Sequence, residues 1–227
     1  MLQEIVRGGQ TRLVVISGRE AAEIPPLLDI HPPPEVWGCH GLQRLRTDGI
    51  LEMLPLSKGT RNGLSEAEHW VDHQQLRDVA EVKRGGIAIH WRGLNETDRK
   101  EIRARVMLGW SAIVKNSGLA LLEFDGGIEI LATEANKGDA VRVLLSEVSP
   151  ETPAAYLGDD TTDESAFQAI EGRGISVLVR PTWRQTAAQS WLKPPQELLE
   201  FLELWLKASL KHAAFGDGAA AAVSGCE

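Results

Sequence analysis

Short, continuous apolar runs constrain the fold of this chain more than any other feature. They lie at residues 12–17, 36–39, 154–157 and 175–179. An apolar run without polar alternation is typical of a strand that is covered on both faces, as in a parallel sheet. Segments with helical spacing follow the last two runs, at 163–170, 185–191 and 194–210. The sequence therefore predicts an α/β protein with a doubly wound parallel-sheet core.

A different rhythm between these runs indicates an inserted unit. Segments with helical spacing alternate there with strand-like stretches, in the order 66–83, 86–93, 96–115 and 119–132. The last stretch has D-G-G at its centre, which is a hairpin signal. We expect an α+β cap at 44–128, inserted between core segments at 1–43 and 129–211. Residues 212–227 are rich in Gly and Ala without a pattern and are predicted to be a disordered tail.

Composition and charge limit the partners of the chain. It has 227 residues, 25% of them charged, and a formal net charge of −8. An acidic chain is not attracted to nucleic-acid phosphates or anionic membranes, so we expect neither as a partner. Cys39 and Cys226 are too few for a disulfide framework, which predicts a reducing compartment. No apolar stretch approaches the ~20 residues of a membrane span, so we expect a cytoplasmic location and leave the oligomeric state open.

The most informative polar motif is G-D-D-T-T-D-E, in which Asp159, Asp160, Asp163 and Glu164 crowd the junction between an apolar run and a helix. Carboxylates this close repel one another unless a cation or a helix N-terminus offsets them. Open α/β sheets bind ligands at the carboxyl ends of their strands, where carboxylates can hold Mg²⁺ together with phosphate and water. A plainer interpretation, acids favoured by the helix dipole, explains Asp163 and Glu164 but not the doublet before them. Thr161 and Glu164 fit a capping box that would start the helix.

Two further motifs point to an anion. Ser17, Gly18 and Arg19 directly follow an apolar run, where the hydroxyl and the following N–H groups can clasp a phosphate. Alone, such a turn is usually just a turn. Lys137 lies near the start of the helix that follows Asn136, where a cation is disfavoured by a few tenths to about 1 kcal/mol. A nearby phosphate or the acidic cluster would offset this cost, and a solvated lysine explains the pattern equally well.

Histidines supply weaker candidates. His69 and His73 have the i, i+4 spacing of metal ligands on a helix. No third ligand is evident, however, and a solvated polar face explains this pair better. His90 and Arg92 alternate along a predicted strand, so they share one face, which can contact a polar ligand.

Five stretches together resemble the trehalose-6-phosphate phosphatases of the haloacid dehalogenase superfamily. In chain order they are V-I-S-G-R, G-C-H-G-L-Q, I-H-W-R, E-I-L-A-T-E-A-N-K-G and G-D-D-T-T-D-E-S-A-F. The last is the most specific, because related sucrose and mannosylglycerate phosphatases look different there. The resemblance implies a doubly wound core, an inserted α+β cap that recognises the sugar, trehalose 6-phosphate as the small-molecule substrate, and Mg²⁺-dependent hydrolysis through an aspartyl-phosphate.

The resemblance also implies roles at the core. Ser17 would match the phosphate-binding hydroxyl, supported by Gly18 and Arg19. Lys137 would match the lysine that neutralises phosphate and nucleophile. The metal would be held, directly or through a second shell, by Asp159, Asp160 and Asp163.

On the cap side, the resemblance implies a set of residues that face the sugar. They are His40, Gly41, His90, Arg92 and Glu129. Two positions depart from the family, since Gln43 stands where Glu is usual and Leu131 where Arg is common. The sugar contacts are therefore expected to differ in detail.

One motif that the resemblance implies does not occur. Members of the family carry D-x-D-G-T, whose first Asp is the nucleophile and whose second is the general acid and base, before the strand that ends at Ser17. Residues 1–16 contain no such motif. Its strand would be central, between those ending at Ser17 and Gly158, so we expect residues 1–227 to lack phosphatase activity. A missed start or a fragment would explain this, and the alternatives are a noncatalytic sugar-phosphate-binding pseudophosphatase or a different sugar phosphatase.

Overall fold

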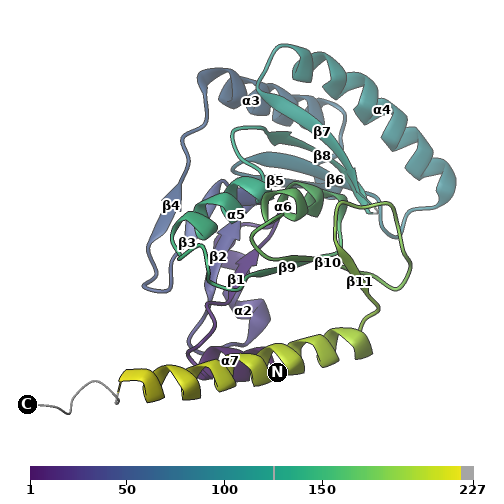
Figure 1. Cartoon of the computed structure of the whole chain (residues 1–227). Coiled ribbons are helices and arrows are strands. Elements are labelled where there is room, and N and C mark those ends of the chain that lie inside the picture. The colour runs from purple at the N-terminus through teal and green to yellow at the C-terminus, as the bar shows by residue number, and fades with distance from the viewer. Residues whose placement is uncertain (125, 221–227) are drawn as a thin grey trace, which may run out of the picture.

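The amino-terminal part of the chain forms a sheet in which parallel and antiparallel strands meet (Figure 1). The computed structural model describes residues 1–124 and 126–220. Along this sheet the strands follow one another as β1 (Val14–Ile16), β2 (Glu35–Gly38), β3 (Gln43–Leu45) and β4 (Leu51–Met53). β1 and β2 are parallel, whereas β3 and β4 extend the sheet antiparallel. The short helices are α1 (Leu2–Arg7) and α2 (Pro25–Leu28).

A second, wholly parallel sheet is built from the last third of the chain. It comprises β9 (Ala155–Gly158), β10 (Ile175–Val179) and β11 (Ser190–Leu192), with β10 in the middle. Two helices, α5 (Lys137–Ser146) and α6 (Glu164–Ala169), pack against each other beside it. Val141 and Ala166 of these helices share an apolar cluster with Ile16 of β1, which holds the two sheets next to each other.

The inserted unit has a sheet of its own, in the order β5-β6-β8-β7 and antiparallel throughout. Its elements are α3 (Lys58–His73), β5 (Ala80–Lys83), β6 (Gly86–His90), α4 (Glu96–Lys115), β7 (Leu119–Phe124) and β8 (Gly127–Ala132). Ile87, Ile89, Ile128 and Ile130 alternate along the two central strands and form a buried core with Trp110 of α4. Because side chains alternate along a strand, Ala88, His90 and Glu129 occupy the opposite face.

The predicted α/β class with parallel core strands is confirmed. α4 has the bounds predicted for the helix at 96–115, and the hairpin appears as β7 and β8. The predicted helix at 66–83 is wrong at both ends. α3 begins earlier, capped by the Ser57 side chain, and residues 80–83 pair with β6 as a strand. The inserted sheet includes all of β8, while β3 and β4 belong to the first sheet.

The predicted helix at 185–191 is also wrong. Residues 180–189 form a loop, and β11 follows it. Tertiary contacts override local spacing here, because Glu164 accepts hydrogen bonds from the Thr186 hydroxyl and the Ala187 backbone N–H, at 2.8 and 2.6 Å. These bonds hold the loop extended over the start of α6.

Helix α7 (Gln196–Ala220) lies beneath both core sheets (Figure 1). The indole N–H of Trp205 donates to the Thr11 hydroxyl at 3.2 Å, which ties the helix to the segment before β1. The helix extends beyond its predicted end, so residues 212–220, predicted as disordered tail, belong to α7. Residues 221–227, with Cys226, lie outside the described residues. No helix in the described part combines the length and apolar character that crossing a membrane requires.

Candidate active site

Asp163 is the central group of the acidic loop that follows β9. Its buried carboxylate accepts hydrogen bonds through one oxygen from Lys137 Nζ and the Tyr156 hydroxyl, both at 2.7 Å. The other oxygen accepts from the backbone N–H groups of Asp159 and Asp160, at 2.9 and 2.8 Å. Burial alone would raise the pKa of Asp163, but the Lys137 charge and these hydrogen bonds outweigh it and hold the pKa below its ordinary value. Asp163 is thus a fixed anion that holds both the lysine and the loop.

The structure corrects one prediction about this loop. The capping box joins Asp160 and Asp163 rather than Thr161 and Glu164, because a 3₁₀ turn at Thr161–Asp163 precedes α6. Asp163, expected in the first or second shell of a metal, accepts two hydrogen bonds through each carboxylate oxygen, and so this side chain positions Lys137.

Glu164, the fourth carboxylate of the cluster, is neutralised by a basic side chain of the same chain. It forms an ion pair with Arg184 and accepts the two bonds from Thr186 and Ala187. Burial would raise the pKa of Glu164, but these donors outweigh that effect and lower it. Two of the four crowded acids are therefore neutralised by basic side chains, Asp163 by Lys137 and Glu164 by Arg184.

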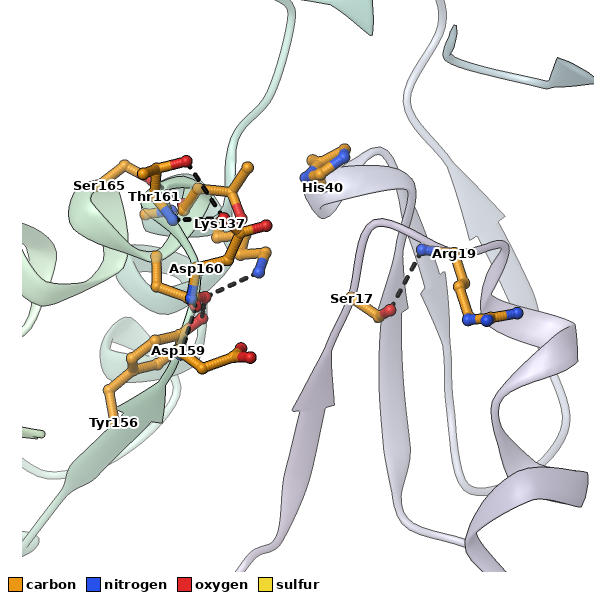
Figure 2. Close-up of polar contacts among 12 residues, drawn as sticks. Ser17, Arg19, His40, Lys137, Tyr156, Asp159, Asp160, Thr161 and Ser165 are labelled. Carbon is orange, nitrogen blue, oxygen red and sulfur yellow. Dashed lines mark hydrogen bonds and ion pairs between the residues drawn. The ribbon is translucent and has the colours of Figure 1, made fainter. Parts of the chain in front are cut away.

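The doublet Asp159 and Asp160 is held through its backbone. Arg180 donates to the carbonyl of Asp159 at 3.1 Å, and Arg184 donates to the carbonyl of Asp160 at 2.6 Å. One oxygen of Asp160 accepts from the Thr161 N–H at 2.6 Å. The Asp159 carboxylate is exposed, accepts no hydrogen bond from the described side chains or backbone, and points into the gap between β9 and β1 (Figure 2). Backbone anchoring with a free carboxylate leaves Asp159 oriented for a ligand.

The described residues contain no group of three or more His, Cys, Asp or Glu side chains gathered to hold a metal. A site here would therefore draw one or two carboxylate oxygens from the protein. This is the usual situation for Mg²⁺ when phosphate and water complete an octahedral shell. His69 and His73 are both exposed on α3, in agreement with a solvated helix face.

Ser17 lies across the gap from Lys137 and Asp159, directly after β1 (Figure 2). Its hydroxyl oxygen accepts the Arg19 backbone N–H at 3.1 Å, which leaves the hydroxyl hydrogen free to donate to an anion. The Arg19 side chain is 60% exposed and turns away from the site towards Glu23, so only its backbone belongs to the turn. Gly18 leaves room for His40, because a Cβ there would lie 2.6 Å from the His40 ring and would displace it.

The stretch after β2 connects the first sheet to α5. Cys39 and His40 adopt left-handed backbone conformations, with φ of 47° and 56°, and Gly41 has φ of 108°. A Cβ at Gly41 would lie 2.7 Å from the backbone oxygen of Asn136, the N-cap of α5. The absence of a side chain at Gly41 therefore allows this turn to pack against the start of the helix that carries Lys137. Burial and the Glu20 charge raise the pKa of the Cys39 thiol to about 11.

Glu129 is the polar group that joins the inserted unit to the core. Its buried carboxylate lies 3.3 Å from His40 Nε2 and 3.0 Å from Lys83 Nζ. Burial alone would raise the pKa of Glu129, but the His40 hydrogen bond and the Lys83 charge outweigh it, so the pKa lies below its ordinary value. Two predicted residues, His40 from the turn after β2 and Glu129 from β8, are therefore brought together.

The remaining residues that the sequence analysis places on the cap side lie in different surroundings. His90 lies on the same face as Glu129, and its Nε2 is 2.7 Å from a Glu81 oxygen. Arg92 is exposed just beyond β6, where its side chain lies over Gly126. Gln43, one of the two departures, is buried and accepts the Ala21 backbone N–H at 2.8 Å, so it supports the core instead of facing the inserted sheet. Leu131, the other departure, lies in β8 opposite Gly86.

Sequence reasoning missed several polar residues of this region. Glu81 and Lys83 alternate in E-V-K, a strand signal that was hidden by the helical interpretation of 66–83. The pattern at 154–157 indicates only an apolar strand around Tyr156, although a phenol among apolar residues needs a hydrogen-bond partner when buried. No sequence signal identifies Arg180 and Arg184, because their carbonyl partners depend on how the loop folds back.

Comparisons with known proteins agree with this arrangement. One relative is a trehalose-phosphate phosphatase of Mycobacterium marinum, which is 29% identical over 210 residues, covering 85% of this chain and 51% of the relative. The chain thus spans about half the length of the curated relatives it matches.

Solved structures of low identity share the fold. The C-terminal domain of a Candida albicans trehalose-6-phosphate phosphatase has a TM-score of 0.70 and 19% identity, with 86% of this chain and 78% of that one covered. An Aspergillus fumigatus trehalose-6-phosphate phosphatase has a TM-score of 0.57 and 21% identity, with 90% and 84% covered. The trehalose-phosphatase family itself matches residues 74–195, which is more than half of the chain. The chain therefore belongs to the trehalose-phosphatase family.

Proposed function

We propose that this chain binds the phosphate and the sugar in a Mg²⁺-dependent phosphatase that acts on trehalose 6-phosphate. The observation that carries the proposal is the placement of Lys137, which is buried, fixed by Asp163 and aimed across the gap at Ser17 (Figure 2). A lysine with one donor fixed keeps two for a phosphate. The M. marinum relative supports the choice of a trehalose phosphate as the substrate class.

The phosphate would lie between Ser17 and Lys137. The Ser17 hydroxyl donates one hydrogen bond, and the Lys137 ammonium offsets negative charge on the phosphate oxygens. Gly18 allows a close approach of the backbone, whereas the Arg19 guanidinium turns away and contributes nothing directly.

Mg²⁺ would be held by Asp159, with Asp160 beside it. The free Asp159 carboxylate fits a direct ligand, and Asp160 has an oxygen left beyond its bond to Thr161. When bound, Mg²⁺ would neutralise the phosphate and help to orient it. Asp163 acts through Lys137 in this arrangement and is not part of the metal shell.

The sugar would lie against the polar face of the inserted sheet. Glu129, Lys83, His40 and His90 offer charged and hydrogen-bonding groups there, as sugar hydroxyls require. The existing ion pairs among these residues would rearrange when hydroxyls enter. Arg92 lies at the exposed rim of this face.

Hydrolysis needs two groups that residues 1–124 and 126–220 do not place. A carboxylate must form a bond to phosphorus while the bond from phosphorus to the sugar oxygen breaks, and a second carboxyl must give that oxygen its proton before water releases the phosphate. Asp159 and Asp160 lie on the metal side, and D-x-D-G-T does not occur in the sequence. We therefore infer that residues 1–227 alone bind without turnover, as a pseudophosphatase would.

The test compares binding with turnover in the same preparation. Calorimetry with trehalose 6-phosphate and Mg²⁺ is expected to give binding that is lost in Lys137→Met and weakened in Ser17→Ala, while phosphate release stays at background. Arg19→Ala is the matched control and is expected to bind like the unmodified chain. Release of phosphate by residues 1–227 would contradict the inferred inactivity, and tighter binding of sucrose 6-phosphate would favour a different sugar phosphatase.

A further inference from the structure

A cavity of about 450 Å³ lies at the edge of the first sheet that is opposite to the candidate active site. Arg12 and Leu13 lead into β1 and Glu35 begins β2, so the cavity borders the amino ends of these parallel strands. Ser17 and His40, by contrast, follow the carboxyl ends of the same strands. The volume is within the range of about 300–1,000 Å³ that small-molecule sites occupy. The residues that line the cavity are different from those assigned to the candidate active site.

A buried network of ion pairs forms one wall of this cavity. Arg44, whose side chain is only 8% exposed, donates to Glu35 at 2.7 Å and to the two oxygens of Glu147 at 2.6 and 2.8 Å. Arg12 Nη2 donates to the same two carboxylates, at 2.6 and 2.7 Å. The guanidinium of Arg44 also lies over the Trp37 ring, 5.1 Å from its centroid. Two cations and two carboxylates thus neutralise one another and fix the wall in place.

The hairpin of β3 and β4 adds two further charges at the rim. Arg46 lies on the same face of this hairpin as Arg44, because side chains alternate along a strand, and its Nε donates to Glu52 at 2.7 Å. Asp48 accepts the Ile50 backbone N–H through one oxygen at 3.0 Å. The cavity is therefore lined by three arginines and three carboxylates. Because these charges balance, a charged ligand would have to compete with an existing partner.

Hydrogen-bonding capacity remains at the cavity although its charges balance. Among residues 1–124 and 126–220, the guanidinium of Arg12 bonds only through Nη2 and that of Arg46 only through Nε. Their other N–H groups are free to donate, and the second oxygen of Asp48 is free to accept. Leu13 and the prolines at 32–34 supply an apolar wall. The complementary ligand is neutral, has hydroxyl groups that both accept and donate, and carries an apolar face.

We propose that this cavity binds a neutral carbohydrate, either a monosaccharide or a disaccharide. Sugar hydroxyls accept hydrogen bonds from guanidinium groups and donate to a carboxylate, while the C–H face of a sugar ring packs against prolines. A phosphate ester fits less well, because its charge would meet three carboxylates and no unpaired cation. The site is separate from the phosphate and metal groups of the proposed function and does not depend on them.

Two-dimensional NMR of the backbone amides of the full chain tests the site, with trehalose as the probe. Titration to about 20 mM is expected to shift the amides of 11–13 and 46–48 with a single millimolar Kd. Glycerol has hydroxyl groups but no ring and is expected to bind there at least about tenfold more weakly. Inorganic phosphate is expected to leave these amides unchanged. Trehalose shifts confined to the candidate active site, no shifts at all, or equal binding of glycerol would overturn the proposal.

Two matched variants localise the binding. Arg46 and Arg103 are both exposed and both donate through Nε to a glutamate, at 2.7 and 2.6 Å, but only Arg46 lines the cavity. Arg46→Ala removes charged donors and is expected to weaken trehalose binding about tenfold or more, whereas Arg103→Ala is expected to bind like the unmodified chain. Equal effects of the two changes would overturn the site.

A third variant keeps the test decisive if Arg46→Ala lowers stability. Thr47→Trp places a large ring at the exposed rim of the cavity and leaves every ion pair intact. It is expected to abolish the trehalose shifts at 11–13 without lowering the melting temperature. Unchanged trehalose binding in this variant would contradict the cavity as the binding place.

Ser17→Ala separates this proposal from the proposed function. The variant is expected to lose the shifts that inorganic phosphate causes at 17–19 and to retain trehalose binding at 11–13 and 46–48. Loss of trehalose binding at the cavity amides would overturn a separate carbohydrate site. Absence of any phosphate effect at 17–19 in the unmodified chain would count against the proposed function alone.

Discussion

Replacing Asp163 by Asn should lower the free energy of unfolding of this protein more than any other conservative change in the acidic loop. The buried carboxylate accepts bonds from Lys137 and Tyr156 through one oxygen and from two backbone N–H groups through the other. The Asn amide has the same size but only one oxygen, so its NH₂ group must face two of the hydrogen-bond donors that the second carboxylate oxygen accepts from. It also leaves the Lys137 charge buried without its partner.

The expected cost can be worked from these contacts. Breaking a buried ion pair by removing one partner costs about 3–5 kcal/mol. Tyr156→Phe removes a single hydrogen bond to a charged group and should cost about 1.5–3 kcal/mol. Lys137→Met combined with Asp163→Asn leaves no orphaned charge, so the double variant should be at least about 1 kcal/mol more stable than the sum of the single effects predicts.

Urea unfolding at neutral pH measures these differences, with circular dichroism and tryptophan fluorescence as independent signals. The pKa of Asp163 is lowered in the folded state, so its contribution is complete above the unfolded-state pKa and is lost as pH falls through the folded-state pKa. The difference in free energy of unfolding between the unmodified chain and Asp163→Asn should therefore become smaller as the pH falls. A cost below about 1 kcal/mol, or additive single effects, would refute a buried, coupled pair.

Two further predictions concern the core. Gly41→Ala should destabilise the chain by about 3 kcal/mol, because φ is 108° and the new Cβ would meet a backbone oxygen at 2.7 Å. The control Gly49→Ala, with φ of 85° and open space around the new Cβ, should cost only about 1 kcal/mol. Equal losses of stability in thermal unfolding would contradict the steric reason. Hydrogen bonds from Arg44 lower the pKa of Glu147 from 4.5 to about 2. Glu147→Gln should therefore be less stable by about 1–2 kcal/mol at pH 7, after allowance for solvent screening, and the difference should vanish between pH 4.5 and 2; a constant difference would argue against this linkage.

Much of the core could be predicted because its signals are local. A continuous apolar run has few alternatives to a covered strand, and the strand at 175–179 has the bounds that the pattern predicts. The capping residue Asn136 likewise fixes the start of α5 and with it the position of Lys137. Both depend on residues a few positions apart.

Other features could not be predicted because their partners lie far along the chain. The loop at 180–189 is extended by Glu164, and β5 is a strand because β6 pairs with it, although both segments have helical spacing. The functional assignment of Asp163 changed for the same reason, since spacing cannot tell whether a carboxylate oxygen is free or already bonded.

The sequence by itself determined the α/β class, the strand ends that carry Ser17 and the acidic loop, and the helix start that carries Lys137. Only the tertiary structure decided which charges neutralise which. It paired Lys137 with Asp163 and Glu164 with Arg184, left Asp159 free, and separated β1 from β9 by a gap. The physical reason is range. Strand and cap preferences act within a few residues, whereas ion pairs and sheet edges depend on segments that only the folded chain brings together.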